Sequence, residues 1–442
     1  MHLIPVAAAA AAWLLTSQAT AQGIGSADTH PKLTTSKCTL ADGCVPHSTS
    51  LVLDASFHPL RAADPSSTTT TTSTARPCGG YGGAAWDEAL CPDRESCARN
   101  CVFDGAEYEG NGVAANGSEL VLRQYMQRDG VAVPVSPRVY LLDEEGDGEG
   151  EKGEGEGGNY AVLHLRNQEI SFDVDVSKLV CGMNGAMYLA EMNATGARSA
   201  LNPAGAAYGT GYCNAQCPVL PFINGEANLD SHGSCCSELD LWEANSVATA
   251  LTPHTCSAPG VFACAGAECG SLGNCDKSGC PYNPYKLGNS TFYGPGSDTV
   301  IDTSRPFTVT TQFLESMGVM NEIRRTYVQD GRTIPNARVP AASPTVPPGD
   351  SIKMSHCQAV GAMFEELGGL AQMGRALDRG MVLVFSIWND DAQFMNWLDS
   401  AGSGPCTRTE GDPELIRANH ADTEVTFSNI RWGDLGSTTL SL

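Results

Sequence analysis

Three carboxylic acids, Glu238, Asp240 and Glu243, lie within six residues of one another and directly follow two adjacent cysteines. The alternation of polar and apolar residues from Glu238 to Leu241 predicts a half-buried β-strand. On a regular strand Glu238 and Asp240 point to one face, whereas Glu243 points to the other. If the three acids share a site, the strand must bulge or bend near Trp242, and such bulges are common beside active sites.

These acids are of the types that cleave a glycosidic bond. Retaining hydrolysis needs two carboxyl groups about 5–5.5 Å apart, of which one attacks the anomeric carbon and the other protonates the leaving oxygen. A third acid can share a proton with the attacking carboxylate. Glu238, Asp240 and Glu243 provide these groups, and His254 could donate a hydrogen bond to them. The residues alone leave open a strand with solvated acids and a purely structural histidine.

The N-terminus and the cysteines indicate an exported protein. Residues 3–16 form an Ala-rich apolar run, and Ala19-Thr20-Ala21 fits a cleavage site, which predicts a signal peptide over 1–21 and a mature start at Gln22. No later segment is apolar over a length that spans a bilayer. In a secreted, extracellular chain the 18 cysteines are expected to form disulfides, although spacings such as Cys264/Cys269 would also suit zinc.

The net charge of the chain limits its partners. A formal net charge of −24 argues against nucleic acid and anionic membranes, and it suits a neutral or cationic ligand. N-glycosylation sequons begin at Asn116, Asn193 and Asn289, and they are meaningful because the chain is expected to be exported.

Short strand-like runs separated by turn residues dominate the sequence. Convincing amphipathic helices are scarce, and residues 365–376 form one modest helix candidate. This all-β pattern predicts two packed antiparallel sheets. The strand-like runs are 50–53, 120–122, 139–142, 160–165, 169–176, 186–190, 307–313, 381–388 and 424–431.

Two low-complexity segments interrupt this pattern. Residues 65–77, mostly Thr and Ser, have the composition of an O-glycosylated or flexible loop. Residues 143–158 are a Glu/Gly repeat between two strand-like runs, which predicts a solvated hairpin insertion. Their acids lack the Asp/Asn pattern and the terminal Glu of an EF-hand calcium loop.

Two aromatic-bearing regions could bind sugars. One contains Trp388 and Trp397, and the other contains Tyr212 and Gln216. Aromatic faces stack on the apolar faces of pyranose rings, while hydroxyl and amide groups bond the sugar hydroxyls. Taken alone, each region fits core packing better than sugar binding.

The stretch from Glu238 to Asn245 resembles the signature of glycoside hydrolase family 7, the fungal-type cellulases, which reads E-[ML]-D-[IL]-W-E-A-N. Further matches follow in order from His30 to Asp434, so the resemblance covers essentially the whole mature chain. They include residues 91–93, 171–176, 209–218, 250–254, 293–296 and 380–384. So many ordered matches exclude the interpretation of the acids as a merely solvated strand face.

The resemblance implies an all-β fold, a concanavalin-like jelly-roll sandwich of two large curved antiparallel sheets with disulfide-stapled loops. It implies a single catalytic domain over 22–442 that hydrolyses β-1,4-glucan with retention, as a monomer and without cofactor or metal. The family's nucleophile falls on Glu238 and its acid/base on Glu243. Its assisting acid falls on Asp240 and its nearby histidine on His254. Its glucose platforms and groove residues fall on Trp388, Trp397, Tyr188, Tyr212 and Gln216.

The family pattern also implies disulfide pairs. Two of them would clamp the catalytic strand to its neighbour, and a third would bridge distant segments. By this resemblance every one of the 18 cysteines finds a partner, so no free thiol is expected. The three pairs are Cys213–Cys236, Cys217–Cys235 and Cys181–Cys406.

Loop lengths favour an endo-acting enzyme over a cellobiohydrolase. Cellobiohydrolases of the family roof the groove with long loops, but only nine residues separate Gly225 from Cys235, and residues 264–280 and 357–368 also look short. Internal β-1,4-glucosidic bonds of cellulose and related β-glucans are therefore the expected target. A cellobiohydrolase and a glucan-binding, lectin-like protein on the same sandwich are the alternatives.

Some positions depart from the family pattern. A distal platform that usually reads Trp-Arg-Trp reads Phe57-His58-Pro59 here, which should weaken distal glucose binding, and Asn214 replaces a common Asp. The chain also stops soon after the last strand-like run, so we expect no carbohydrate-binding module.

Overall fold

The computed structural model describes residues 23–63, 76–80, 85–145, 158–341, 343 and 345–439. The predicted signal peptide, most of the Thr-rich segment 65–77 and most of the Glu/Gly segment 143–158 lie outside these residues. Within the described part of the chain, no helix is long and apolar enough to cross a membrane.

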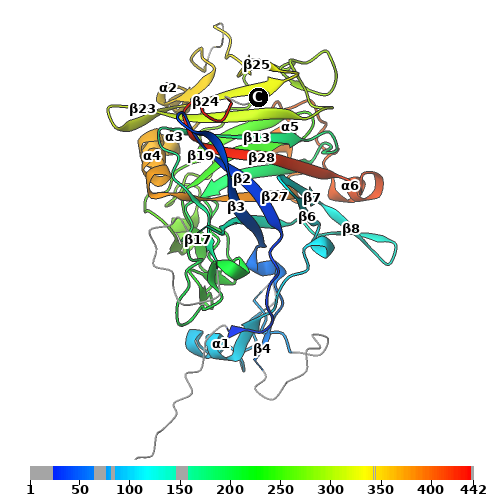
Figure 1. Ribbon diagram of the computed structural model, residues 1–442, viewed down its shortest axis with the longest axis vertical. Helices are drawn as coiled ribbons and strands as arrows, with labels where there is room; N and C mark the ends of the chain where they lie inside the picture. Colours follow the sequence, from blue (N-terminus) through cyan, green and yellow to red (C-terminus); the bar gives the residue numbers. More distant parts are fainter. Residues whose placement is uncertain are drawn as a thin grey trace, which may run out of the picture.

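Two large antiparallel sheets pack around one main hydrophobic core, as the sequence predicts (Figure 1). Strand β2 (Lys32–Thr39) pairs with both sheets, so hydrogen bonds connect them into one network of 17 strands. The sheet that contains the catalytic strand β18 (Glu238–Ala244) is called the inner sheet, and the other is called the outer sheet. The inner sheet has the strand order β19 (Thr249–His254), β18, β14 (Met183–Ala190), β27 (Met381–Asn389), β10 (Arg138–Asp143) and β3 (Gly43–Leu53). The outer sheet has the order β24 (Val319–Gln329), β23 (Phe307–Ser316), β13 (Gln168–Asp175), β28 (Glu424–Asp434), β7 (Glu119–Arg123) and β6 (Val113–Asn116).

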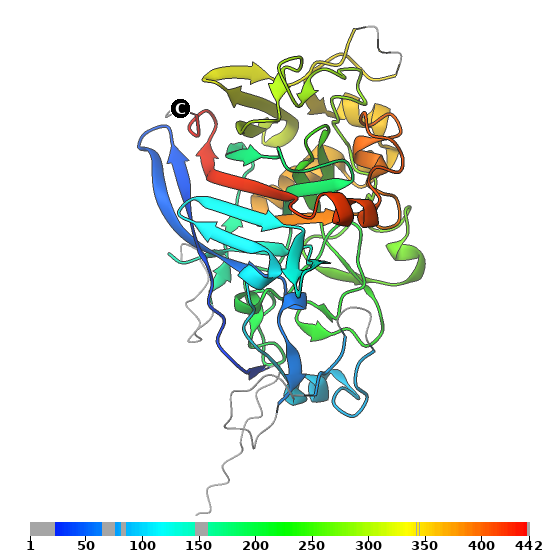
Figure 2. The same ribbon diagram turned by 90° about the vertical axis from the view of Figure 1, so that its right-hand side faces the viewer.

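Shorter elements surround the sandwich. Figure 2 shows β6 and β7 in cyan beside the red β28, with which β7 pairs. A small unit at the lower end of the long axis contains α1 (Arg94–Asn100), β1 (Gly23–Ile24), β4 (Leu60–Ala62) and β5 (Cys101–Phe103) (Figure 1). The other helices are α2 (Met354–Val360), α3 (Ala362–Glu366), α4 (Gly369–Arg379), α5 (Asn396–Asp399) and α6 (Pro413–Asn419). The other strands are β8 (Tyr125–Arg128), β9 (Val131–Pro134), β11 (Asn159–Tyr160), β12 (Val162–Leu163), β15 (Phe222–Ile223), β16 (Glu226–Ala227), β17 (Gly233–Cys235), β20 (Phe262–Cys264), β21 (Tyr293–Gly294), β22 (Ile301–Asp302), β25 (Arg332–Pro335) and β26 (Ser351–Lys353).

Aromatic side chains fill the space between the two sheets. Trp242 of β18 is fully buried and lies edge-to-face against Phe172, Tyr293 and Phe307, with ring centroids 5.8–6.1 Å apart. These contacts join the inner sheet to β13 and β23 of the outer sheet. Burial of one such ring contributes about 2–3 kcal/mol to folding, so the catalytic strand is fixed from its core side.

The predicted strand runs match strands of the structure with one exception. Residues 160–165 form the separate short strands β11 and β12 rather than one strand. Strand β10 continues into β11 as an antiparallel hairpin, with Asp143 opposite Asn159, as predicted for the flanks of the Glu/Gly segment. Strand β24 was not among the predicted runs, although its burial alternates along most of its length.

The helix predicted at 365–376 is confirmed over most of that range, but it is not continuous and its bounds differ. The structure has two helices there, α3 and α4, and the second begins at Gly369 and ends at Arg379. The break falls at Gly368, whose φ of 92° lies in the left-handed region that a continuing α-helix does not contain.

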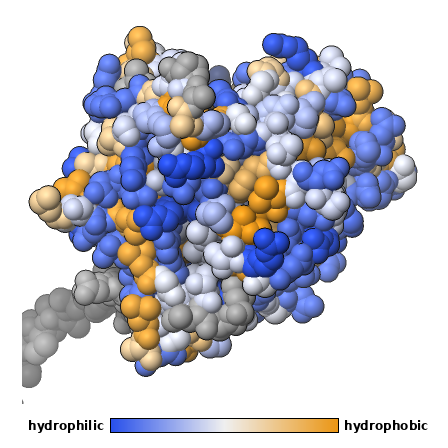
Figure 3. All heavy atoms as spheres, turned by 90° about the horizontal axis from the view of Figure 1, so that it is seen from above, coloured by the Kyte–Doolittle hydropathy of each residue, from blue (hydrophilic) through white to orange (hydrophobic). Residues whose placement is uncertain are grey.

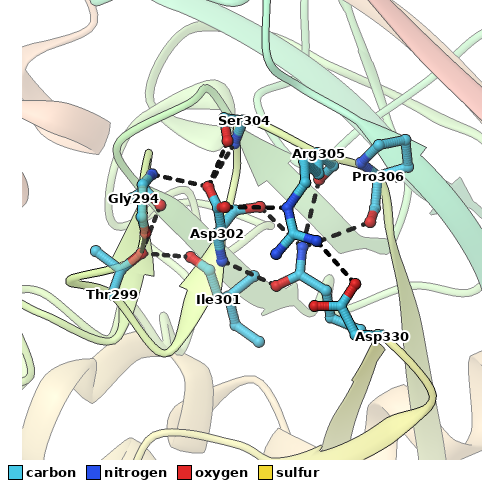
Figure 4. A network of polar contacts seen from close by, with 10 residues as sticks. Gly294, Thr299, Ile301, Asp302, Ser304, Arg305, Pro306 and Asp330 are labelled. Atoms are coloured by element: carbon cyan, nitrogen blue, oxygen red, sulfur yellow. Dashed lines mark hydrogen bonds and ion pairs between the residues drawn. The ribbon is translucent and has the colours of Figure 1, made fainter.

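A turn between β21 and β23 is organised by the carboxylate of Asp302 (Figure 4). Its Oδ1 accepts hydrogen bonds from the backbone N–H groups of Gly296 and Ser304 and from the Ser304 hydroxyl, and its Oδ2 accepts one from Arg305. These bonds hold the pKa of Asp302 well below its usual range. The same segment reaches the end of β18, since the Tyr293 hydroxyl donates to the carbonyl of Asn245 at 2.9 Å.

Polar side chains dominate the face that Figure 3 shows, and apolar side chains form separate patches on it. Large exposed apolar residues such as Val131, Leu272 and Met317 lie on different elements. Isolated exposed residues of this kind are normal at protein surfaces.

Nine disulfides join all 18 cysteines, so no free thiol is present. The three predicted pairs are confirmed, and Cys264 and Cys269 form a disulfide rather than a zinc site. The three pairs are Cys213–Cys236, Cys217–Cys235 and Cys181–Cys406.

Loop length predicts unequal contributions of the disulfides to stability. Cys181–Cys406 closes a loop of 225 residues, whereas Cys38–Cys44 closes one of 6. In the chain-entropy account, loss of the first costs about 5 kcal/mol of unfolding free energy and loss of the second about 2 kcal/mol. Cys-to-Ser double variants of the two pairs, compared by guanidinium unfolding, test this. Equal losses would contradict it.

Candidate active site

Strand β18 carries a β-bulge at Leu241. On β14, Met187 pairs with Trp242, and the following residue pairs with Asp240, so Leu241 has no partner on that strand. The register with β19 also shifts between Asp240 and Glu243. One extra residue in a strand reverses the side-chain alternation beyond it. The bulge predicted near Trp242 is therefore present.

The bulge places the three acids on one face of the inner sheet. The apolar side chains of the strand point into the main core. Glu238, Asp240 and Glu243 instead line a cleft of about 870 Å³ on the opposite face, and each is less than one tenth exposed. The acids are thus buried from bulk water but accessible from the cleft.

All the site residues named from the sequence line this one cleft. It brings together side chains from β10, β14, β18, β19 and β27 and from the loops between them. Sequence reasoning did not single out Arg138, Lys277, Lys286 or Asp390, which also line it. The residues from the sequence are Glu238, Asp240, Glu243, His254, Trp388, Trp397, Tyr188, Tyr212 and Gln216.

The imidazole of His254 bridges Asp240 and a backbone carbonyl. Its Nε2 lies 3.0 Å from Oδ2 of Asp240, and its Nδ1 lies 2.8 Å from the carbonyl oxygen of Asp276. Because a carbonyl oxygen only accepts hydrogen bonds, Nδ1 carries a proton and donates it. One further proton then lies between Nε2 and the Asp240 carboxyl group.

Glu238 is contacted by the loop 212–217. The backbone N–H of Ala215 donates to Oε2 of Glu238 at 3.0 Å, and such a bond favours the ionised carboxyl group. Two disulfides join this loop to Cys235 and Cys236, directly before the strand. The disulfides therefore fix the donor relative to its acceptor.

Glu243 is held by Asn184 of β14. The Asn184 amide donates to Oε1 of Glu243 at 2.9 Å, and its oxygen accepts from the backbone N–H of Ala244 at 3.1 Å. Asn184 is fully buried. Nothing in its local sequence signals this contact, because the two residues are brought together only by the β14–β18 pairing.

Burial raises the pKa of all three acids. It raises the pKa of Glu238, Asp240 and Glu243 to about 8 each, against about 4 for exposed acids. The charge of Asp240 raises the pKa of both glutamates further, and Glu243 also raises that of Glu238. The three groups are therefore close enough to repel one another, and they do not all ionise at neutral pH.

A tryptophan pair forms one part of the cleft wall. The rings of Trp388, at the end of β27, and Trp397, in α5, are stacked with centroids 6.2 Å apart and an interplanar angle of 29°. Trp397 is 37 % exposed. The neighbouring Asp399 holds α5 in place, since it accepts hydrogen bonds from Asn245 and from the backbone N–H of Gly182, both at 2.7 Å.

Tyrosines and one arginine form another part of the wall. The hydroxyls of Tyr188 and Tyr212 are 2.9 Å apart, and the Asn214 amide donates to the latter at 3.0 Å. The guanidinium of Arg138 stacks 3.6 Å from the centre of the Tyr212 ring and is paired with Asp54. Arg138 and Tyr212 also line an adjoining cavity of about 460 Å³.

The segment Phe57-His58-Pro59 does not line the cleft. His58 is only 2 % exposed, and its ring nitrogens lie 3.1 Å from the carbonyl oxygens of Leu53 and Asp104. Phe57 is partly buried against the main core. These side chains therefore stabilise the loop after β3 instead of presenting a flat aromatic face.

Comparison with known proteins agrees with this geometry. A family model described as Glycosyl hydrolase family 7 matches residues 22–439. The chain belongs to this family. The resemblance inferred from the sequence is thereby confirmed, and the protein is a glycoside hydrolase.

Its relatives include endo- and exo-acting enzymes. The chain is 52 % identical to a probable endo-β-1,4-glucanase celB of Aspergillus clavatus, over 95 % of this chain and 94 % of the other. The native endocellulase EGI of Humicola insolens has a TM-score of 0.86 at 43 % identity, covering 94 % of this chain and 100 % of that one. A cellobiohydrolase of Daphnia pulex has a TM-score of 0.82 at 35 % identity, and the match covers 94 % of this chain and 99 % of that one.

The raised pKa of Asp240 predicts a pH-dependent cost to stability. The group titrates near 3.9 when unfolded and near 8 in the fold, so the folded protein holds this proton more tightly. The contribution of this proton to the free energy of unfolding is fully present below about pH 4 and is lost as the pH rises toward 8. The free energy of unfolding of Asp240→Asn, compared with that of wild type, should therefore be higher at pH 8 than at pH 4 by roughly 2 kcal/mol or more.

Denaturant unfolding of both proteins at the two pH values measures this difference. The exposed acid Glu119 of β7 provides the control, since Glu119→Gln removes a carboxyl group outside the cleft. A gain for Asp240→Asn that is no larger than that for Glu119→Gln would contradict the prediction.

Proposed function

We propose that this protein is a secreted, retaining endo-β-1,4-glucanase, which cleaves internal bonds of cellulose and related β-glucans by double displacement. The observation that carries the proposal is the bulge in β18, which gathers Glu238, Asp240 and Glu243 in one cleft. The endo-β-1,4-glucanases and endocellulases among the relatives support the substrate class and the endo mode.

Glu238 is the proposed nucleophile. It accepts a hydrogen bond from the rigidly held N–H of Ala215, which stabilises its ionised form. Its attack on the anomeric carbon forms a covalent glycosyl-enzyme and expels the leaving oxygen. Asp240 and His254 lie beside it and share a proton, which limits the negative charge next to Glu238.

Glu243 is the proposed acid/base. Burial raises the pKa of Glu243 and keeps its proton on at mildly acidic and neutral pH, so it can protonate the departing oxygen. After the first step the same carboxylate removes a proton from the water that hydrolyses the glycosyl-enzyme. The Asn184 amide orients it in both steps.

The walls of the cleft supply the proposed glucose-binding groups. Trp388 and Trp397 offer flat faces for pyranose rings, and Tyr188, Tyr212 and Gln216 offer hydroxyl and amide groups. Arg138 adds a guanidinium between the cleft and the adjoining cavity. A neutral polysaccharide fits this mixture of aromatic faces and hydrogen-bonding groups.

The short connection after β16 supports an open groove. The hairpin β15–β16 is followed within a few residues by β17, so little chain is present to roof the cleft. An open groove admits the middle of a chain, as endo action requires. Secretion is supported by the fully oxidised cysteines and by the exposure of Asn116 and Asn193 in their sequons. A monomer remains part of the proposal.

Two single variants test the assigned roles. Glu238→Gln should lose at least about 10⁴-fold in kcat while cello-oligosaccharides still bind, because the nucleophile is absent. Glu243→Gln should lose about 10²–10⁴-fold on substrates with poor leaving groups, and azide should restore turnover of activated substrates as β-glycosyl azide. A wild type without turnover of any β-glucan would instead favour the lectin-like alternative.

The endo mode predicts a rapid fall in polymer length. Random internal cuts lower the viscosity of carboxymethyl-cellulose long before much reducing sugar appears. Viscosity and reducing ends are therefore measured in parallel on this substrate, with mixed-linkage glucan as a second one. Release of mainly cellobiose from crystalline cellulose, with little change in viscosity, would favour the cellobiohydrolase.

A further inference from the structure

A buried arginine crosses the core toward the catalytic strand. Arg325 lies on β24 of the outer sheet and is only 3 % exposed. On that strand Ile323 and Tyr327 flank it on the same inward face and belong to the main core. Its side chain extends between the two sheets to β18, whose acids lie on the far side of the inner sheet.

The guanidinium contacts the bulge itself. Nη2 of Arg325 donates to the carbonyl oxygen of Leu241, the residue that has no partner on β14. The same nitrogen lies 3.3 Å from the hydroxyl of Thr311, and the guanidinium carbon lies 5.7 Å from the centre of the Trp242 ring. Arg325 therefore contacts Leu241 and Trp242, the two residues at which the side-chain alternation of β18 changes.

Arg325 is a buried cation without an acidic partner among the described residues. No ion pair involves it in that part of the chain, and its Nε has no hydrogen-bond acceptor there. Burial lowers its pKa, and the electrostatic interaction with Tyr327 opposes that change. A cation in an apolar core without a counter-ion is destabilising unless its remaining contacts are strong. An apolar side chain would fill this space at lower cost, so core packing alone does not explain the arginine.

The bulge is the feature on which the three acids depend. If Leu241 moved back into regular pairing, the alternation would place Glu243 on the core side of the sheet. A carbonyl oxygen that accepts a bond from a fixed guanidinium resists this shift, because the move would leave both groups unpaired in the core. The contact is thus strongest in the conformation that keeps Glu243 in the cleft.

We propose that Arg325 is a positioning residue for the reaction, which holds the β18 bulge and through it the acid/base Glu243. The inference rests on the proposed function, since it assumes that Glu243 protonates the leaving oxygen. It concerns Glu243 more than Glu238, because Glu238 precedes the bulge and is fixed by Ala215.

The test compares substrates that differ in their need for an acid. The variants are Arg325→Met, which keeps length and volume without donors, Arg325→Lys, which keeps one charged donor, and Ile323→Ala as a matched control. Ile323 lies on the same strand and face and belongs to the same core, but its side chain has no group that can donate a hydrogen bond to Leu241. Its variant therefore reports general damage to the core. Each folded protein is assayed for kcat/KM on 2,4-dinitrophenyl and on phenyl β-cellobioside.

We expect a loss that depends on the leaving group. For phenyl β-cellobioside, kcat/KM of Arg325→Met should fall about 10- to 100-fold, because phenoxide needs protonation on departure. For the dinitrophenyl substrate, which leaves without protonation, it should stay within about 3-fold of wild type. Arg325→Lys should show the same selective loss at smaller amplitude. Ile323→Ala should lower thermal stability but leave the ratio of the two substrates unchanged.

Other results would overturn the inference. It fails if folded Arg325 variants keep the wild-type ratio of the two substrates, or if Ile323→Ala changes the ratio as much as they do. Should Arg325→Met not fold, Arg325→Lys decides by the same ratio. A wild type that turns over neither cellobioside would overturn the proposed function, and the role of Arg325 with it.

Discussion

The direction in which each side chain of β18 points is the constraint on which the site depends. A regular strand with this sequence would divide its three acids between the core and the solvent, and neither arrangement would be stable or reactive. One unpaired residue, Leu241, removes the conflict. It lets Trp242 anchor the strand in the aromatic core while Glu243 joins Glu238 in the cleft. Packing and chemistry are satisfied by the same local irregularity.

Gathering the acids works against folding, and the surrounding structure compensates for it. Three carboxyl groups buried in one cleft disfavour their own ionisation, which is useful for proton transfer but destabilising at neutral pH. The opposing contributions come from the core between the sheets and from the disulfides. Two of the disulfides lie directly before the strand, where they also fix the donor to Glu238.

Much of the fold and of the site could be predicted because the relevant signals are local. Alternating or β-branched residues marked most strands of the two large sheets, and the odd spacing of Glu243 marked the bulge. The residues that were missed act across the fold. Asn184 and Arg325 look ordinary in their own segments, and only strand pairing or sheet packing brings them to Glu243 and Leu241. The helix break at Gly368 was missed because apolar periodicity continues across it.

The β10–β11 hairpin has a practical consequence for engineering. Its strands pair at Asp143 and Asn159, so the ends of the intervening segment lie side by side in the fold. Lengthening a loop whose ends are already held together costs little, since the entropy of closure grows only with the logarithm of length. This position is therefore a natural point for inserting a foreign binding domain, which would travel with the catalytic domain without a terminal linker.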